Sequence, residues 1–216
     1  MMKVLVACEY SGTVRDAFLD AGHMAVSCDL LPTESTYPKD AMPEHIPWNG
    51  HFQGDIWDLL AIDSDWDLMI AHPPCTHLSV SGARWFPPHT KEGEPGYKPP
   101  HLREEALQFV QDLMDLPIPR ICIENPLSVI SSRIRKADQT VQPYEFGHME
   151  QKRTCFWLKN LPPLKKDPRL NVKEEMMELP VQERCRVWYA GSGKGKERSI
   201  FFRGIAQAMA DQWGKN

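Results

Sequence analysis

One segment of the sequence places a nucleophile directly after a pair of prolines. The apolar run Leu68–Ala71 stops before Pro73 and Pro74, and Cys75 follows at once. Because neither proline can donate to a β-ladder and the residue before a proline is pushed out of the helical region, the run is predicted to be a buried strand. A thiol just past such a strand would stand at the sheet edge where open α/β sheets bind ligands. The competing interpretation is a small buried cysteine in a turn.

Other residues with useful chemistry also follow apparent strands, namely Gly12, Asp29, Asp55 and Glu124. An acid at the end of a second strand, as Asp29 is, suits the diol of a ribose. Asp55 could accept from the amino group of adenine, and Glu124 could share a proton with a ring nitrogen. Together with the soft nucleophile Cys75, these groups imply group transfer from a nucleoside-containing cofactor to an electrophilic ring.

The elements expected around these residues form a Rossmann-like unit. Residues 3–8 (KVLVAC) are predicted to be a first buried parallel strand. Residues 13–21 carry apolar side chains at helical spacing and end at Gly22, a usual helix terminus, and residues 24–28 are a predicted second strand. The chain is therefore expected to belong to the α/β class, with helices on both faces of a sheet.

The rest of the chain is interpreted with the same rules. Residues 32–53 show no periodicity and are expected to be a surface loop. Residues 82–100 are rich in proline and glycine, and a loop of that length beside a reactive residue is more often a lid than filler. The remaining predictions are helices at 57–62, 102–116 and 200–213, strands at 120–123 and 154–158, and a proline- and charge-rich excursion at 161–181.

The composition narrows the class of protein. No apolar run approaches the ~18 residues that span a bilayer, and 42% hydrophobic residues are enough for a core. The six cysteines lie far apart with no CxxC pair, which favours thiols in a reducing compartment over disulfides or a metal site. We therefore expect a cytoplasmic protein with no membrane contact, no bound metal and no obligate protein partner.

Charge is divided unevenly along the chain. Residues 1–130 hold 8 Lys and Arg against 19 Asp and Glu, whereas residues 131–216 hold 17 against 10. This split favours a basic surface that contacts a polyanion. A solvated basic surface without a partner is the alternative.

Taken in order along the chain, these residues resemble the motifs of the DNA cytosine-C5 methyltransferases. The matches are Gly12, Asp29, Gly54-Asp55-Ile56, Pro73-Pro74-Cys75 with residues 79–82, Glu124-Asn125, Gln151-Lys152-Arg153 and residues 204–206. The amino-methyltransferases of similar fold carry an aromatic residue after their two prolines, so a cysteine there points to methylation of carbon. The resemblance implies a class I methyltransferase sheet that binds S-adenosyl-L-methionine.

The resemblance also implies roles for single residues. Cys75 would add to C6 of cytosine, Glu124 would hold or protonate N3, and Arg153 would bind O2, once the base has left the DNA stack. The implied cofactor contacts are Glu9, Tyr10, Ser11, Gly12, Thr13, Asp29, Leu30, Asp55, Ile56 and Pro73. The implied DNA contacts are Ser79, Ser81, Arg84, Trp85, Gln151, Lys165, Lys166, Arg184, Arg186, Lys194 and Lys196, and Arg84, Trp85 and Phe86 are candidates to fill the gap that the base leaves.

The chain departs from this family in size. Residues 160–198 alone separate the eighth motif from the last helix, so we expect a catalytic domain of residues 1–159 and 199–216 and a reduced recognition insertion of residues 160–198. So small an insertion leaves little room for reading bases in the major groove. The resemblance thus implies an enzyme of low sequence specificity acting on duplex DNA, similar to the compact forms that phages carry into the cytoplasm of a bacterial host.

Other functions fit parts of the pattern. A zinc deaminase needs a PCxxC motif, which does not occur. A cysteine hydrolase with His72 or His77 as base lacks a third group to orient that base. Three alternatives stay open: a modified donor such as carboxy-S-adenosylmethionine, a deoxycytidine nucleotide as substrate, and a DNA-binding module without catalytic activity.

Overall fold

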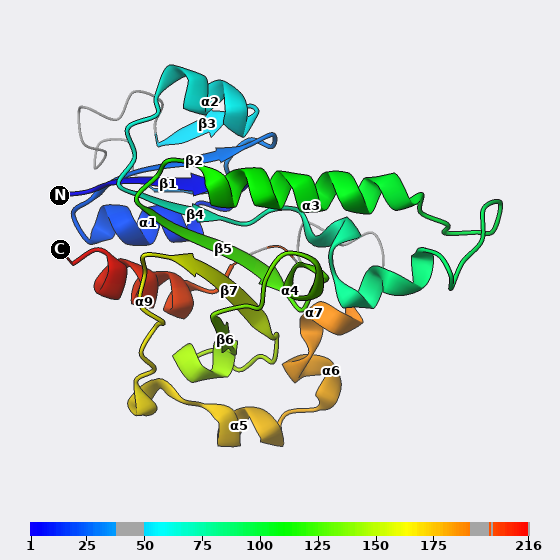
Figure 1. Ribbon diagram of the computed structural model, residues 1–216. Coiled ribbons are helices and arrows are strands. Elements are labelled where there is room, and N and C mark those ends of the chain that lie inside the picture. Colours follow the sequence, from blue (N-terminus) through cyan, green and yellow to red (C-terminus); the bar gives the residue numbers. More distant parts are fainter. Residues whose placement is uncertain (38–49, 191–198, 200, 216) are drawn as a thin grey trace.

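A sheet of seven strands forms the centre of the protein in this computed structural model (Figure 1), which describes residues 1–37, 50–190, 199 and 201–215. The strand order is β3-β2-β1-β4-β5-β7-β6. The strands are β1 (Lys3–Ala7), β2 (Met24–Asp29), β3 (His51–Gln53), β4 (Leu68–Ala71), β5 (Arg120–Pro126), β6 (Gln139–Val141) and β7 (Thr154–Lys159).

Strand direction brings the ends of most strands to one side. The strands from β3 to β5 are all parallel, whereas β7 runs antiparallel to β5 and β6 runs antiparallel to β7. The carboxyl ends of β3, β2, β1, β4 and β5 therefore share one edge, which we call the carboxyl edge. Because β7 is reversed, its first residue, Thr154, also lies at this edge, paired with Pro126.

The central strands are covered on both faces. All four residues of β4 are buried, and in β1 only Lys3 is partly exposed. A parallel strand with elements packed on both sides has no solvent face, so its sequence is a continuous apolar run rather than an alternation. This explains why both strands can be recognised in the sequence.

Helices lie on both faces of the sheet. On one face α1 (Thr13–Asp20) packs against α9 (Arg203–Trp213). On the other face α2 (Ile56–Ile62) lies beside α3 (Pro100–Asp115), where the rings of Trp57 and Phe109 meet edge to face with centroids 5.9 Å apart. The right-handed connections of parallel strands require this division. The predicted α/β, Rossmann-like fold with helices on both faces is confirmed.

Shorter elements lie between the strands and between β7 and α9. They are α4 (Ile130–Arg133), α5 (Lys173–Glu178), α6 (Val181–Arg184), α7 (Arg186–Tyr189) and 3-10 turns at Cys75–His77, Val80–Trp85, Pro143–Phe146 and Pro168–Leu170. In Figure 1, α5, α6 and α7 lie beyond β6 and β7, away from β1. Within the described ranges, none of the helices is both long enough and apolar enough to cross a lipid bilayer.

The first residues after β7 pack on the main body of the protein. Trp213 Nε1 donates to the carbonyl of Pro162 at 2.9 Å, and the amide of Lys165 donates to Gln212 Oε1 at 2.8 Å. Leu164 between them is 3% exposed and belongs to the core. The division at residue 160 into a catalytic domain and an insertion stays a prediction.

Several predicted boundaries are wrong. Residues 51–53, expected to be loop, form β3, and residues 38–49 of that loop lie outside the described part of the chain. The last helix was expected from residue 200, but α9 begins at Arg203 because Phe202, which directly precedes it, is extended and buried. The strand β6 had no counterpart among the predicted strands.

Gly204 tests the packing of α9 against the turn before β7. Its amide donates to His148 Nε2 at 2.8 Å, and a Cβ at this position would lie 2.0 Å from the carbonyl oxygen of Phe146. We expect Gly204→Ala to lower the free energy of unfolding by about 1–3 kcal/mol, as overpacking does, measured by denaturant titration. Gly82→Ala is the control, because its Cβ would have its nearest contact at 3.4 Å, to Ser79 Oγ. An equal decrease in the free energy of unfolding of both variants would contradict the close packing at Gly204.

Candidate active site

The carboxyl edge gathers residues from six strands into two halves. Strands β3, β2 and β1 end in the residues predicted to hold a cofactor, and strands β4, β5 and β7 carry the residues predicted to be catalytic. Strand order reverses between β1 and β4, and ligands of open α/β sheets bind at such a switch point. The two halves therefore meet where this fold is best suited to bind a ligand.

Cys75 begins the turn that follows β4. Its side chain is exposed and forms no disulfide, whereas Pro73 is buried. The carbonyl of Cys75 accepts from the amides of Leu78 at 3.1 Å and Ser79 at 2.9 Å, which closes the turn. The competing interpretation of a buried structural cysteine is therefore wrong for Cys75.

Three hydrogen bonds join the turn after β4 to the segment after β5. Asn125 Nδ2 donates to the carbonyl of Pro73 at 2.8 Å in a buried position. The amide of Val129 donates to the carbonyl of Leu78 at 2.9 Å, and the amide of Val80 donates to that of Leu127 at 3.0 Å. The role of Asn125 is thus to fix the backbone that displays Cys75, and the sequence indicated this residue only as part of a motif.

Glu124 lies beside His72 at the same edge. Glu124 is 8% exposed, and its Oε2 is 2.9 Å from His72 Nδ1. The amide of His72 donates to the carbonyl of Ala7 at 2.9 Å, which extends the pairing of β4 with β1. The sequence indicated His72 only as a possible base of a hydrolase, because nothing in the sequence relates it to Glu124.

Arg153 is exposed and directly precedes β7. Its charge lowers the pKa of Cys155 on that strand, although burial is the largest effect and raises this pKa. Glu124 acts on the same thiol and raises its pKa. Cys155 is therefore a buried thiol that both Glu124 and Arg153 affect electrostatically.

Two cations pack beside the Cys75 turn. Lys98 Nζ donates to the carbonyl of Thr76 at 2.9 Å, and Arg103 Nε donates to that of His77 at 3.3 Å. Both cations lie over the ring of Phe86, at 5.8 Å and 3.8 Å from its centroid. Burial and the charge of Arg103 lower the pKa of Lys98, and the nearby Cys75 thiolate raises it. These cations give the thiol the electropositive surroundings typical of reactive cysteines.

Phe86 does not fit its predicted role as a filler of the DNA stack. Its ring is 2% exposed and forms the centre of the 82–100 segment, so it cannot reach a duplex without unpacking that segment. Trp85 is partly buried against Gly96, and Arg84, which is exposed, lies 4.7 Å from the Trp85 ring. A DNA contact by Arg84 and Trp85 stays a prediction.

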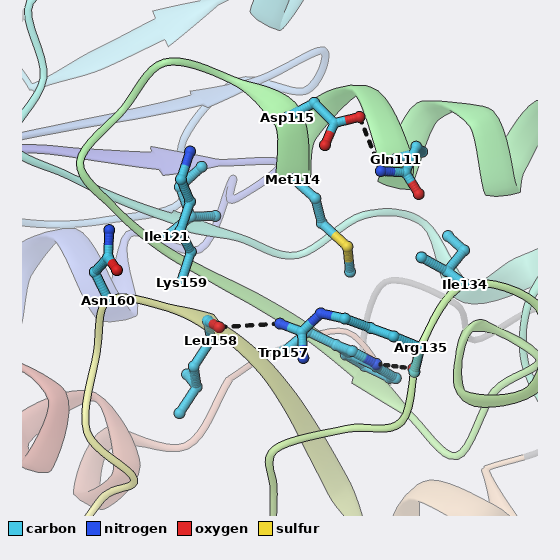
Figure 2. Close-up of a pocket in the computed structure, with 10 residues that line it drawn as sticks. All are labelled: Gln111, Met114, Asp115, Ile121, Ile134, Arg135, Trp157, Leu158, Lys159 and Asn160. Atoms are coloured by element: carbon cyan, nitrogen blue, oxygen red, sulfur yellow. Dashed lines mark hydrogen bonds between the residues drawn. The ribbon is translucent and has the colours of Figure 1, made fainter.

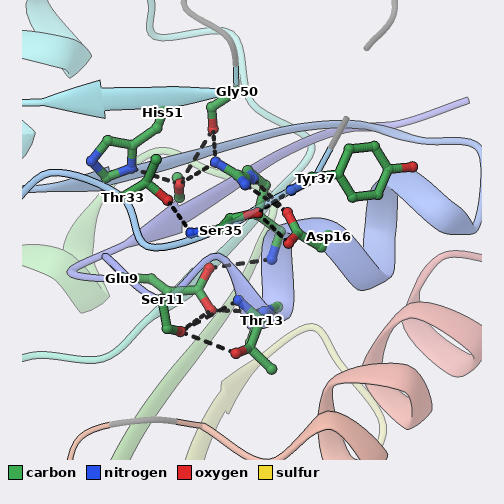
Figure 3. Close-up of polar contacts among 12 residues, drawn as sticks. Glu9, Ser11, Thr13, Asp16, Thr33, Ser35, Tyr37, Gly50 and His51 are labelled. Atoms are coloured by element: carbon green, nitrogen blue, oxygen red, sulfur yellow. Dashed lines mark hydrogen bonds and ion pairs between the residues drawn. The ribbon is translucent and has the colours of Figure 1, made fainter. Parts of the chain in front are cut away.

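In the other half of the edge, Glu9 caps α1. Its carboxylate accepts from the amide of Val14 at 2.7 Å and from the amide of Arg15 at 3.2 Å (Figure 3). Ser11 Oγ is 3.1 Å from Thr13 Oγ1 in the same turn. Burial raises the pKa of Glu9, and the charge of His72 opposes this rise.

Gly12 lies under the segment that follows β2. Its φ is +73°, and a Cβ there would lie 2.5 Å from Ser35 Cβ. Ser35 Oγ donates to Asp16 Oδ2 at 2.6 Å, and the buried Arg15 donates to Asp16 Oδ1 at 2.6 Å and to the Gly50 carbonyl at 3.0 Å (Figure 3). Gly12 therefore has a structural reason to be glycine besides any contact with a cofactor.

The two acids predicted to hold a nucleoside both cap backbone turns. Asp29 Oδ1 accepts from the amide of Leu31 at 2.9 Å, and Asp55 Oδ1 accepts from that of Trp57 at 3.0 Å, at the start of α2. The apolar side chains around them are exposed, with Leu30 at 71% and Trp57 at 38%. Ile56, also predicted to contact the cofactor, is buried. This part of the edge combines carboxylates with an apolar surface.

Tyr10 connects the turn after β1 to the start of the last segment. It is 6% exposed, and its hydroxyl lies 3.1 Å from Ser199 Oγ. Ile205, in the motif assigned to residues 204–206, is fully buried in α9. Contact with the cofactor in this region would therefore come from residues before α9, and Ile205 belongs to the core.

The predicted DNA contacts divide into two groups. Gln151, Arg184 and Arg186 lie together, since the Gln151 amide donates to the Arg184 carbonyl at 2.6 Å and Arg186 pairs with Glu150 at 3.0 Å. The Arg184 guanidinium donates to the carbonyl of Met177 at 2.9 Å, so it closes the turn between α5 and α6. Ser79 and Ser81 are 3.2 Å apart near the Cys75 turn, and Lys194 and Lys196 lie outside the described residues.

Lys165 and Lys166 are not near the candidate catalytic residues. Lys165 is bonded to Gln212 in the last turn of α9, whereas the first turn of α9 is the one at the carboxyl edge, where Phe201 contacts His72. Lys166 is paired with Glu145 at 2.7 Å. Lys165 therefore lies toward the opposite end of the sheet from Cys75, and a DNA contact by these two lysines stays a prediction.

A groove of about 560 Å³ lies at that opposite end, between the end of α3 and the end of β7 (Figure 2). Its polar side chains are largely paired with each other and with the backbone: Arg135 donates to the carbonyl of Leu158 at 3.0 Å, and Trp157 Nε1 donates to that of Arg135 at 2.8 Å. We assign the groove to packing between these elements. Among the described residues, no group of His, Cys, Asp and Glu side chains is arranged to hold a metal ion.

Comparison with known proteins adds one likeness. No family model and no curated protein matches the chain. A solved structure from an E. coli prophage, described as a candidate DNA modification methyltransferase, is similar with 12% sequence identity and a TM-score of 0.43. The match covers 73% of this chain and 46% of that one, so the chain spans about half the length of that protein.

Replacing Lys98 by Met is expected to slow alkylation of Cys75 near neutral pH. The ammonium group favours the thiolate, which is the reactive form of cysteine. A partly exposed charge pair such as Lys98 and Cys75 contributes less than about 1 kcal/mol. In Lys98→Met the midpoint of the curve of labelling rate against pH should therefore rise by about half a pH unit. The rate of iodoacetamide labelling, followed by mass spectrometry of the Cys75 peptide in a Cys185→Ala background, measures this.

Buried thiols do not compete in that experiment, because burial raises the pKa of Cys8 and of Cys28 to about 12. Lys91→Met is the matched control, since Lys91 is an exposed lysine of the same segment. If the midpoint moves equally in both variants, or in neither, Lys98 does not stabilise the thiolate.

Proposed function

We propose that the protein is a DNA cytosine-C5 methyltransferase that uses S-adenosyl-L-methionine. The observation that supports the proposal is the order of three neighbouring strands: Cys75 follows β4, Glu124 lies on β5 and Arg153 directly precedes the antiparallel β7. A nucleophile, a carboxyl group and a cation in this order are the groups that addition to a cytosine ring requires.

The residues at the ends of β1, β2 and β3 suit the proposed cofactor. Asp29 uses Oδ1 for the Leu31 amide, and its Oδ2 makes no hydrogen bond within the described residues, so this oxygen could accept from a ribose hydroxyl. Leu30 offers an exposed apolar surface between Asp29 and the start of α2, which suits the face of an adenine. Bound S-adenosyl-L-methionine would supply the methyl group.

The protein's own residues would prepare the base. The Cys75 thiolate forms a bond to C6, and the electron pair displaced from the ring is accommodated as N3 takes a proton from Glu124. Arg153 binds O2 and stabilises the negative charge that develops on the ring. After C5 has been methylated, C5 loses its proton to solvent, the bond between Cys75 and C6 breaks, and the N3 proton returns to Glu124.

We infer that the substrate is duplex DNA, read with low sequence specificity. Residues 131–216 carry the excess of basic side chains, and Gln151 and Arg186 lie close to each other beyond β7. The neighbouring aromatic residues of α7, Trp188 and Tyr189, are 68% and 52% exposed. Basic side chains bind phosphates without reading bases. The short segment of residues 160–198 offers few contacts to base edges.

Incubation with S-adenosyl-L-methionine and unmodified duplex DNA, followed by digestion and mass spectrometry of the nucleosides, tests the proposal. We expect 5-methylcytosine from the wild type and from Cys185→Ala, which removes a half-buried thiol that is not among the proposed catalytic residues. Cys75→Ala should lower the rate by more than about a thousandfold, because the covalent step is lost.

Product formed by Cys75→Ala at the wild-type rate would exclude Cys75 as nucleophile. If no protein gives product, calorimetric titration with S-adenosyl-L-methionine separates the remaining cases. Binding without methylation would indicate a different acceptor, such as a deoxycytidine nucleotide. Absence of binding would indicate a modified donor or a DNA-binding module.

A further inference from the structure

His72 joins the two halves of the carboxyl edge. It directly follows β4, and the structure places it between Glu9, at the end of β1, and Glu124, on β5. Its ring packs against Phe201 with centroids 4.8 Å apart, so the side of the imidazole that faces the segment before α9 is apolar. Glu124 contacts this imidazole, and Glu9, which accepts from the amide of Arg15, interacts with it electrostatically.

The contact with Glu124 is well defined. His72 Nδ1 lies 2.9 Å from Glu124 Oε2, and the two side chains are 12% and 10% exposed. His72 Nε2 is buried without a hydrogen-bond partner among the described residues. Burying a polar nitrogen costs free energy that an apolar residue at position 72 would not incur. The imidazole therefore has to be explained by what Nδ1 does.

The geometry leaves one carboxylate oxygen of Glu124 for a substrate. Oε2 is engaged by His72, whereas Oε1 makes no hydrogen bond within the described residues. A carboxylate can only accept hydrogen bonds, so when Glu124 is ionised the hydrogen between the two groups must belong to Nδ1. An N–H that points at one oxygen also fixes the rotation of the carboxyl group, and with it the direction of Oε1.

We propose that His72 is the positioning residue for Glu124: its Nδ1–H holds Oε2, directs Oε1 at N3 of the base, and stabilises the carboxylate left behind when Glu124 protonates N3. This role rests on the proposed function of the site. As the bond between Cys75 and C6 forms, the proton passes from Oε1 to N3, and the His72 hydrogen bond becomes charge-assisted and therefore stronger. As the bond between Cys75 and C6 breaks, the proton returns from N3 to Oε1. His72 keeps its own proton throughout.

The protonation of His72 can be measured without any reaction. In the ¹⁵N-labelled protein, two-bond proton–nitrogen correlation spectra distinguish a ring nitrogen that carries hydrogen from one that does not. We expect Nδ1 of His72 to carry the hydrogen in the wild type, and the resonance of this hydrogen to move upfield in Glu124→Gln, because a neutral amide accepts a weaker hydrogen bond than a carboxylate. An Nδ1 without hydrogen, or a resonance unchanged by Glu124→Gln, would overturn the proposal.

Two substitutions separate positioning from packing. His72→Asn keeps an N–H close to the position of Nδ1, whereas His72→Leu removes it. We expect His72→Leu to lower kcat about ten- to a hundredfold with KM nearly unchanged, less than the 10²–10⁴ that a direct proton donor contributes. His72→Asn should recover kcat to within about threefold of the wild type. Equal loss in both variants would indicate packing alone and overturn the proposal.

The matched control is His23→Leu. His23 is also partly buried, and its Nδ1 accepts from the amide of Met2 at 3.3 Å, at the amino end of β1 and thus far from Cys75. It should lose stability as His72→Leu does and keep its kcat. If the wild type makes no 5-methylcytosine, the proposed function fails while the spectra still decide the contact between His72 and Glu124. If the wild type is active and His72→Leu is equally active, the role of His72 alone fails.

Discussion

The register between β4 and β5 is the constraint on which the candidate site depends. Ala71 lies opposite Ile123, so the next residue on each strand, His72 and Glu124, are brought to the same level at the carboxyl edge. Pro73 follows immediately and is bonded to Asn125, which carries the same alignment into the Cys75 turn. A slip of one residue would send Glu124 to the opposite face of the sheet. The apolar burial of both strands, which cannot tolerate such a slip, therefore also fixes the chemistry.

The carboxyl edge contains buried polar atoms whose missing hydrogen bonds cost free energy of folding. Within the described residues, buried polar atoms without a partner include His72 Nε2, His77 Nδ1, Arg103 Nη2 and Asn125 Oδ1, all close to the Cys75 turn. Lys98 lies near Arg103 although burial and the charge of Arg103 both lower the pKa of Lys98. Buried polar atoms without hydrogen-bond partners are expected at a site where a protein positions groups for a substrate.

The sequence predicts the fold well where strands are buried on both faces, and poorly at the edges of the sheet. β1 and β4 are continuous apolar runs, so their pattern has one interpretation. β3 (HFQ) and β6 (QTV) are three residues long, with a neighbour on one side only, and their polar residues give no periodic signal. The hydrophobic pattern of the sequence therefore does not predict strands that are stabilised by pairing with a neighbour rather than by burial.

The candidate site was predictable to the extent that residues follow strands. The position of Cys75 follows from that rule, whereas Glu124, expected just past a strand of residues 120–123, lies within β5, which continues to Pro126. The contact between His72 and Glu124 joins residues 52 positions apart and needs the register. The place of Lys165 in the fold was not predictable, because charge in the sequence does not say which end of the sheet a returning segment follows. Phe86 was misassigned because an aromatic residue in a polar loop can be the centre of that loop.

The packing around Phe86 has a consequence for how the protein would meet a large substrate. The 82–100 segment is held by the Phe86 ring, by the amide of Lys98 bonded to the carbonyl of Trp85 at 2.8 Å, and by Thr90 bonded to the carbonyl of Arg84. A segment that is ordered beforehand loses little conformational entropy on binding, so most of its contact energy remains available as affinity. Association would then be limited by encounter and orientation rather than by a slow folding step, and heat-capacity change on binding would reflect the contact surface alone.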